Sequence, residues 1–177
     1  MVREALQDGL KGEALSDAVF AQIARKENLS PEGMLKAVLS GLNDNYTLTK
    51  WYDQTNYGHL LRSVTMKVSD NESKKEEIQK NLIYIVQDFC YEKTFPTIDI
   101  KPGVSKRLIE LLLTDLLVGD IVDVEGIIAW ADDLSDNDYN GRAEAIIHTT
   151  GMITTLRASL EEEEVEGNGD ECFDSPR

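Results

Sequence analysis

Hydrophobic residues recur at three- and four-residue steps along much of this chain, which is the spacing of one face of an α-helix. The pattern is clearest between Glu76 and Tyr91, where its hydrophobic members are Ile78, Leu82, Ile85, Val86 and Phe89. A second helix is predicted from Pro31 to Leu42. Ser30 can supply the N-cap hydroxyl for this helix, and proline is favoured at the first helical position.

The same spacing predicts further helices on both sides of these two. They are expected over residues 2–10, from residue 16 to beyond residue 23, over 51–68 as one or two helices, over 104–118, over 123–131, and in a last helix that ends near residue 160. Residues 69–75 are predicted to form a polar loop. Pro96 and Pro102 predict an irregular link over residues 95–103, because proline ends helices. No alternating segment is long enough to predict a strand.

These elements predict an all-α fold. We expect one domain over residues 1–164, built of stacked antiparallel helical hairpins as in HEAT-like or armadillo-like α-solenoids. From Val165 onward the sequence is acidic and rich in glycine, so residues 165–177 are expected to form a disordered tail.

The net charge of the chain limits which classes of molecule it is expected to bind. Its 177 residues carry a formal net charge of −15. A nucleic acid or an anionic membrane would approach against this field, so direct binding to either is not expected, and a Lys/Arg-rich partner is favoured. Cys90 and Cys172 are too few for a disulfide framework, and no segment predicts a secretory signal or a membrane span. A cytoplasmic protein is therefore expected.

The sequence contains no recognisable catalytic, cofactor or metal motif. Its two histidines, His59 and His148, have no cysteine or histidine neighbours at zinc-site spacing. Residues 136–141 match the first six positions of a calcium-binding loop, but Ile147 stands where a bidentate glutamate is needed. An interhelical turn explains the same residues. We therefore expect no metal, no cofactor and no enzyme activity.

Acidic residues gather in two places toward the end of the chain. The first cluster contains Asp120, Asp123, Glu125, Asp132 and Asp133, and the second contains Glu161, Glu162, Glu163 and Glu164. Like charges this close repel one another, and a cationic partner would relieve the repulsion. Trp130 lies within the first cluster and has two interpretations: it is a core side chain, or it organises a partner-binding face.

These clusters resemble the two acidic-aromatic boxes of a known family, the C-terminal domain of eukaryotic translation initiation factor 5, the factor 2B epsilon subunit, factor 4G and the factor-5 mimics. Asp115–Trp130 resembles the first box, most of all over Gly119–Trp130. Leu156–Glu164 resembles the second box, although Thr155 stands where the family usually has tryptophan. Leu82–Lys93 looks most like the preceding helix of the factor-5 mimics. The resemblance implies a HEAT-type domain that binds the lysine-rich N-terminal segment of the initiation factor 2 beta subunit and, in some members, factor 3 subunits.

The sequence leaves two alternative functions open. The resemblance to the epsilon subunit implies a guanine-nucleotide exchange domain, in which Glu4 occupies roughly the place of a critical acidic residue. A glutamate in the first turn of a helix is also simply favoured by the helix dipole. The other alternative is a helical scaffold that binds its partner through an apolar groove, and this binding would persist at high salt.

Overall fold

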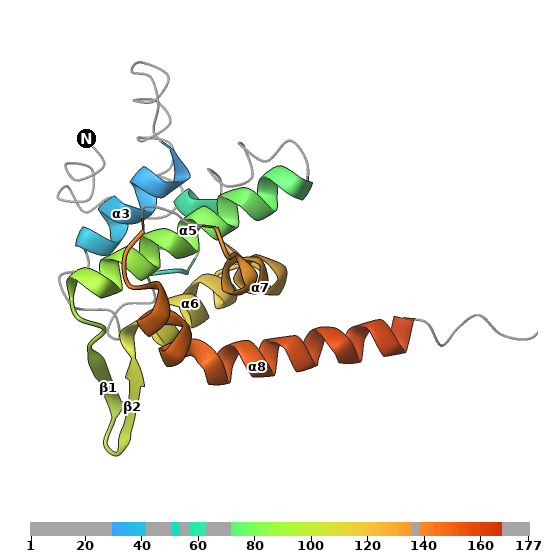
Figure 1. The fold of residues 1–177 in the computed structure, drawn as a ribbon. Helices are drawn as coiled ribbons and strands as arrows, with labels where there is room; N and C mark the ends of the chain where they lie inside the picture. Colours follow the sequence, from blue (N-terminus) through green and yellow to red (C-terminus); the bar gives the residue numbers. More distant parts are fainter. Residues whose placement is uncertain (1–29, 42–50, 54–56, 63–71, 136–138, 168–177) are drawn as a thin grey trace, which may run out of the picture.

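A computed structural model describes residues 30–41, 51–53, 57–62, 72–135 and 139–167 of the chain. Its elements, in chain order, are α3 (Pro31–Gly41), α5 (Glu72–Glu92), β1 (Thr97–Lys101), β2 (Val104–Arg107), α6 (Leu108–Val118), α7 (Val124–Asp132) and α8 (Arg142–Gly167). A short helical turn covers residues 58–62. The fold is thus mostly helical, with a small two-stranded sheet (Figure 1). None of the described helices is long and apolar enough to cross a membrane.

The first described helix starts where the sequence predicts. Ser30 lies just before Pro31, and its Oγ accepts a hydrogen bond of 3.2 Å from the backbone N–H of Gly33, which satisfies one donor at the helix end. The fully buried side chains of α3 belong to Met34, Leu35, Val38 and Leu39. This hydrophobic face packs against α5.

Helix α5 lies at the centre of the molecule and contacts α3, α6, α7 and α8. Hydrophobic side chains are therefore buried around most of its circumference, from Ile78 to Cys90. The predicted helix over 76–91 is confirmed, but it begins earlier, at Glu72. The loop predicted over 69–75 is therefore wrong for its last four residues. Residues 72–75 are all polar, so the hydrophobic pattern does not reach them, although glutamate at the start of a helix is favourable.

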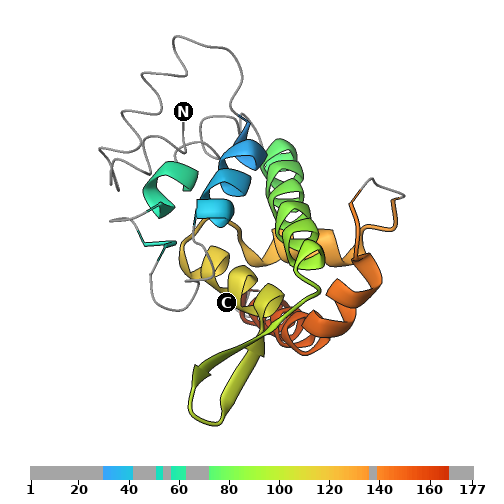
Figure 2. The same ribbon diagram turned by 90° about the vertical axis from the view of Figure 1, so that its left-hand side faces the viewer.

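A β-hairpin replaces part of the predicted irregular link and the predicted helix start at residue 104. Strands β1 and β2 pair antiparallel, with Thr97 opposite Arg107 and Lys101 opposite Val104. Gly103 has a φ of 79°, and such a positive φ suits glycine in the tight turn between the strands. Helix α6 starts only at Leu108 because Arg107 is still extended. The all-α prediction is wrong here, and Figures 1 and 2 show the hairpin projecting from the helices.

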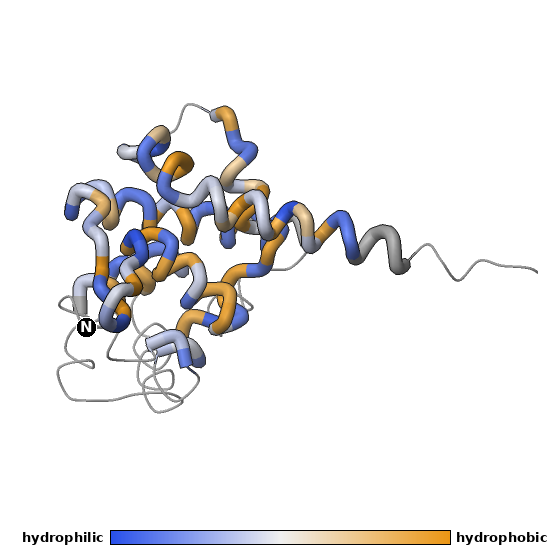
Figure 3. The backbone as a smooth tube through the Cα atoms, turned by 90° about the horizontal axis from the view of Figure 1, so that it is seen from below, coloured by the Kyte–Doolittle hydropathy of each residue, from blue (hydrophilic) through white to orange (hydrophobic). Residues whose placement is uncertain are grey.

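The last helix is longer than predicted. Its first half packs into the core through Ala145, Thr149 and Ile153, all of which are buried. Its C-terminal end projects beyond the rest of the molecule (Figure 3). The helix ends at Gly167 rather than near residue 160, so the predicted start of the tail at residue 165 falls inside it. Residues 168–177, like the helices predicted before residue 30, lie outside the described part of the chain.

Candidate functional site

Two adjoining pockets lie between the start of α5 and the start of α7, and the larger one reaches α8. Their volumes are about 360 and 460 Å³, and they share Lys75, Gln79, Asp123 and Glu125. We call them together the acidic groove. Its remaining lining residues are Glu76, Leu117, Asp120, Val122, Val124, Ser159 and Leu160. The groove thus combines carboxylates with hydrophobic side chains, and it brings the first predicted acidic cluster next to residues that lead into the second.

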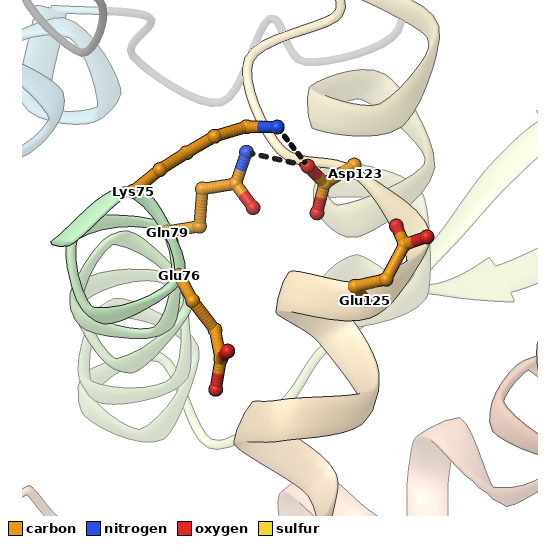
Figure 4. Close-up of a pocket in the computed structure, with 5 residues that line it drawn as sticks. All are labelled: Lys75, Glu76, Gln79, Asp123 and Glu125. Carbon is orange, nitrogen blue, oxygen red and sulfur yellow. Dashed lines mark hydrogen bonds and ion pairs between the residues drawn. The ribbon is translucent and has the colours of Figure 1, made fainter. Parts of the chain in front are cut away.

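Asp123 holds the two helices of the groove together. It is the N-cap of α7, and its Oδ1 accepts a 2.9 Å hydrogen bond from the backbone N–H of Gly126. Its Oδ2 accepts a 3.1 Å hydrogen bond from Gln79 Nε2 and lies 2.9 Å from Lys75 Nζ (Figure 4). Partial burial alone would raise the pKa of Asp123, but Lys75 and the hydrogen bonds outweigh it and lower this pKa. Both oxygens of Asp123 are therefore engaged within the protein.

Asp133 has a similar structural role at the other end of α7. Its carboxylate accepts hydrogen bonds from the Ser135 backbone N–H at 2.9 Å and from the Tyr84 hydroxyl at 2.8 Å. Lys80 Nζ lies 3.0 Å from it. The hydrogen bonds from Ser135, together with Lys80 and Tyr84, hold the pKa of Asp133 far below its usual range. Asp133 joins α7 to α5 and is nearly buried.

The remaining two aspartates of the first cluster also have cationic partners. Asp132 forms an ion pair with Arg157 of α8. Asp120 lies 3.5 Å from Arg62 Nη1, yet its side chain is 85% exposed. Four of the five predicted carboxylates therefore each meet a cation of the same chain. Within the described residues, only Glu125 of this cluster lacks such a partner.

Glu76 is a groove residue that the sequence does not point out. It comes from α5, while Glu125 comes from α7, and the two side chains line the same pocket (Figure 4). Both glutamates are exposed, and neither forms a salt bridge within the part of the chain that the structure describes. These two groove carboxylates are therefore available to a ligand without first breaking an ion pair that the structure describes. The sequence does not single out Glu76, because only the fold brings it next to Glu125, a residue 49 positions later.

Trp130 is a core residue. Its ring is fully buried, its Nε1 donates a 3.1 Å hydrogen bond to Gln87 Oε1, and the Arg142 guanidinium lies 5.2 Å from the ring centre. The first of its two sequence-based interpretations is therefore correct. The ring cannot touch a partner directly, and it supports α7 only from beneath the surface.

The second acidic cluster continues α8 beyond the groove. Ser159 and Leu160 line the groove, and the exposed Glu161 and Glu162 follow them directly. Glu163 and Glu164 lie in the same helix. Helix α8 therefore places the start of this cluster at the rim of the acidic groove.

Other predicted residues lie elsewhere. Glu4 and residues 136–138 of the calcium-loop resemblance are outside the described residues. Among the residues that are described, no group of three carboxylate, histidine or cysteine side chains could hold a metal ion. His148 packs against the ring of Phe95, 5.5 Å away, and burial raises the pKa of the Cys90 thiol far above its usual range. A buried thiol of this kind is inert as a nucleophile.

No protein-family model matches the sequence, and a search of curated proteins finds no match either. The resemblance to the initiation-factor domains thus depends on the residues quoted above alone.

Proposed function

We propose that this chain is a non-enzymatic, cytoplasmic regulator of translation initiation whose acidic groove binds the lysine-rich segment of the initiation factor 2 beta subunit. A subunit of initiation factor 3 is a second partner under this proposal. The helices would form a HEAT-like stack, as in the family that the sequence resembles. The observation that carries the proposal is a groove that combines unpaired carboxylates with hydrophobic side chains.

The lining of the groove suits a lysine side chain. Lysine has a hydrophobic stem and a cationic head, and it buries the stem while its ammonium group stays near water or an acid. Leu117, Val124 and Leu160 can contact such a stem. Glu76 and Glu125 can pair with the ammonium group through charge-assisted hydrogen bonds.

The predicted site residues then divide into two groups. The exposed carboxylates at the groove and its rim, Asp120, Glu125, Glu161 and Glu162, together with Glu76, contact the partner. Asp123, Asp132 and Asp133 hold α7 in place through their internal cations. Trp130 packs beneath them. Reversing the charge of a residue in the first group should weaken binding without unfolding the protein.

Charge-reversed variants test this proposal by calorimetric titration with a lysine-rich peptide. Glu76→Lys and Glu125→Lys should each weaken binding by about tenfold or more, because a favourable contact becomes a repulsive one. Glu92→Lys is the matched control: it makes the same change at an exposed glutamate at the opposite end of α5. If Glu92→Lys weakens binding as much as the groove variants do, the groove is not the site.

The hydrophobic lining also favours the second candidate, a scaffold that binds an apolar partner segment in the same groove. The two candidates differ in their response to salt. Binding of a cationic peptide through exposed carboxylates should fade between low and moderate salt, whereas apolar binding should persist. The titration is therefore run at both salt concentrations.

A further inference from the structure

Asp115 is a buried carboxylic acid with an unusual environment. Asp115 lies on α6 and is only 7% exposed. Its Oδ2 accepts a 2.7 Å hydrogen bond from Trp51 Nε1. The described residues give its side chain no other hydrogen bond and no salt bridge. Burial raises the pKa of Asp115 to about 6, although the hydrogen bond from Trp51 acts in the opposite direction.

Trp51 belongs to a compact unit that we call the Trp51 segment, residues 51–53 and 57–62. Its two parts are joined by backbone hydrogen bonds from Tyr57 N to Trp51 O at 2.9 Å and from Gly58 N to Asp53 O at 3.1 Å. The segment meets α6 and the residues that follow it at Asp115, Gly119 and Asp120. A Cβ on Gly119 would lie only 3.1 Å from the Tyr52 backbone oxygen, so the approach is close.

We propose that Asp115 and Trp51 form a pH-sensitive latch that holds the Trp51 segment against α6 tightly when Asp115 is protonated and loosely when it is ionised. A neutral carboxyl can accept the Trp51 hydrogen bond without placing a charge in the core. An ionised carboxylate accepts the same bond but loses its hydration, and no described cation compensates for this loss.

The direction of the pH effect follows from the two states of Asp115. The pKa is about 6 when the segment is docked, and the ordinary value is 3.8. Docking is therefore strongest below pH 4 and weakens as pH rises through 6. Between pH 5 and pH 7 docked Asp115 changes from mostly protonated to mostly ionised, whereas a solvent-exposed Asp115 is ionised at both pH values. The docking equilibrium constant should therefore fall by about tenfold over this range.

The other titratable and charged groups that the structure describes around Asp115 do not supply the missing cation. The segment itself carries Tyr52, Asp53, His59 and Arg62, and Asp120 follows α6. Arg62 is directed at Asp120, and the negative charge of Asp115 contributes to the raised pKa of Tyr52. Asp53 adds a further negative charge. Among the described residues no cation is therefore left to neutralise Asp115, and protonation neutralises it instead.

The latch also reaches the acidic groove, although it does not depend on the function proposed for that groove. Arg62 lies on the Trp51 segment and pairs with Asp120, which lines the groove. Loosening the segment would release Arg62 and leave the Asp120 carboxylate free. Neutral pH would thus make the groove more acidic than mildly acidic pH does.

The two tryptophans of the chain give a test with an internal control. In ¹H–¹⁵N spectra between pH 4.5 and 8, the Trp51 indole N–H should titrate with a midpoint near pH 6. The Trp130 indole N–H donates to the neutral amide of Gln87, so it should not titrate. Solvent exchange of the Trp51 indole, taken relative to that of Trp130, should increase by about tenfold from pH 5 to pH 7. Trp51→Phe assigns the two signals.

Two aspartate variants complete the test. Asp115→Asn keeps an acceptor for Trp51 but cannot ionise, so both the titration and the change in relative exchange should disappear. Asp99→Asn makes the same change at an exposed aspartate of β1 and should leave both effects in place. A Trp51 indole signal that does not titrate in the wild-type protein overturns the latch, whether or not Asp115→Asn folds. So does an exchange rate that rises equally for both tryptophans.

Discussion

At the scale of single residues, burial decides what each acid does. Asp115 and Asp123 are both partly or wholly removed from water, yet their pKa values move in opposite directions. Within the described residues, the Asp115 carboxyl accepts a hydrogen bond only from the Trp51 indole N–H, whereas the Asp123 carboxylate meets Lys75, Gln79 and a backbone N–H. The number and charge of the donors around a carboxylate therefore set its role, and sequence position does not.

Asp115→Asn should stabilise the protein at pH 7. The ionised carboxylate costs stability there, and the pKa difference from 3.8 to about 6 corresponds to about 3 kcal/mol at most. At pH 4 the folded wild-type protein already carries a protonated Asp115, so the gain should nearly vanish. Urea unfolding at both pH values measures the difference. If Asp115→Asn changes the free energy of unfolding equally at pH 4 and pH 7, Asp115 does not have a raised pKa in the folded protein.

Asp123→Ala should destabilise the protein by about 1–2 kcal/mol at pH 7, because α7 loses its N-cap and Lys75 loses its partner. The folded pKa of Asp123 is lowered, so its contribution is present above the ordinary value of 3.8 and is lost as pH falls through the folded pKa. Glu125→Ala in the same groove should change stability by less than about 0.5 kcal/mol. Urea unfolding of both variants checks the contrast.

At the scale of elements, long helices could be predicted and short strands could not. The helix over 76–91 has five hydrophobic residues at helical spacing, and α5 contains all of them. The strands β1 and β2 have five and four residues, which is too short for alternation to stand out. Pro102 and Gly103 predict a break between helices, and the same residues also suit a hairpin turn.

Two glycines test the assignment of these elements. Gly103→Ala should destabilise the protein by about 1 kcal/mol, because its φ of 79° is unfavourable for a residue with a Cβ. A Cβ added at Gly103 would meet no described atom within 4 Å apart from its chain neighbours, so the cost comes from the backbone conformation alone. Gly151→Ala, in an open position on α8, should stabilise by up to about 1 kcal/mol. If thermal unfolding shows that both substitutions stabilise the protein, or that both destabilise it, the turn at Gly103 or the helix at Gly151 is wrongly assigned.

At the scale of the whole molecule, ion pairs within the chain reduce the number of acidic residues that remain available to a partner. The acids of the first cluster are adjacent in sequence, but their cations come from Arg62, Lys75, Lys80 and Arg157. Each of these cations is at least 25 positions from its partner, and no spacing rule connects them. The sequence could therefore predict an acidic region, but only the fold shows which of its carboxylates, Glu76 and Glu125, have no ion-pair partner among the described residues.

Salt should weaken peptide binding more than it weakens the fold. The groove carboxylates that remain unpaired are exposed, so their attraction to a lysine-rich peptide is screened by salt. The core of hydrophobic side chains is not screened in this way. Calorimetry and thermal unfolding over the same salt series should therefore diverge, with affinity falling while the melting temperature stays constant or rises. Parallel losses of both would point to salt-sensitive folding instead.

The central claim is that the acidic groove is the partner-binding site, and mapping of amide shifts on titration with a lysine-rich peptide tests it most directly. We predict that the shifted ¹H–¹⁵N signals centre on the groove, at residues 75–79, 120–125 and 159–162, and that Glu125→Lys removes these shifts. Shifts centred on α3 or on the β-hairpin, or no shifts at low salt, would contradict the claim.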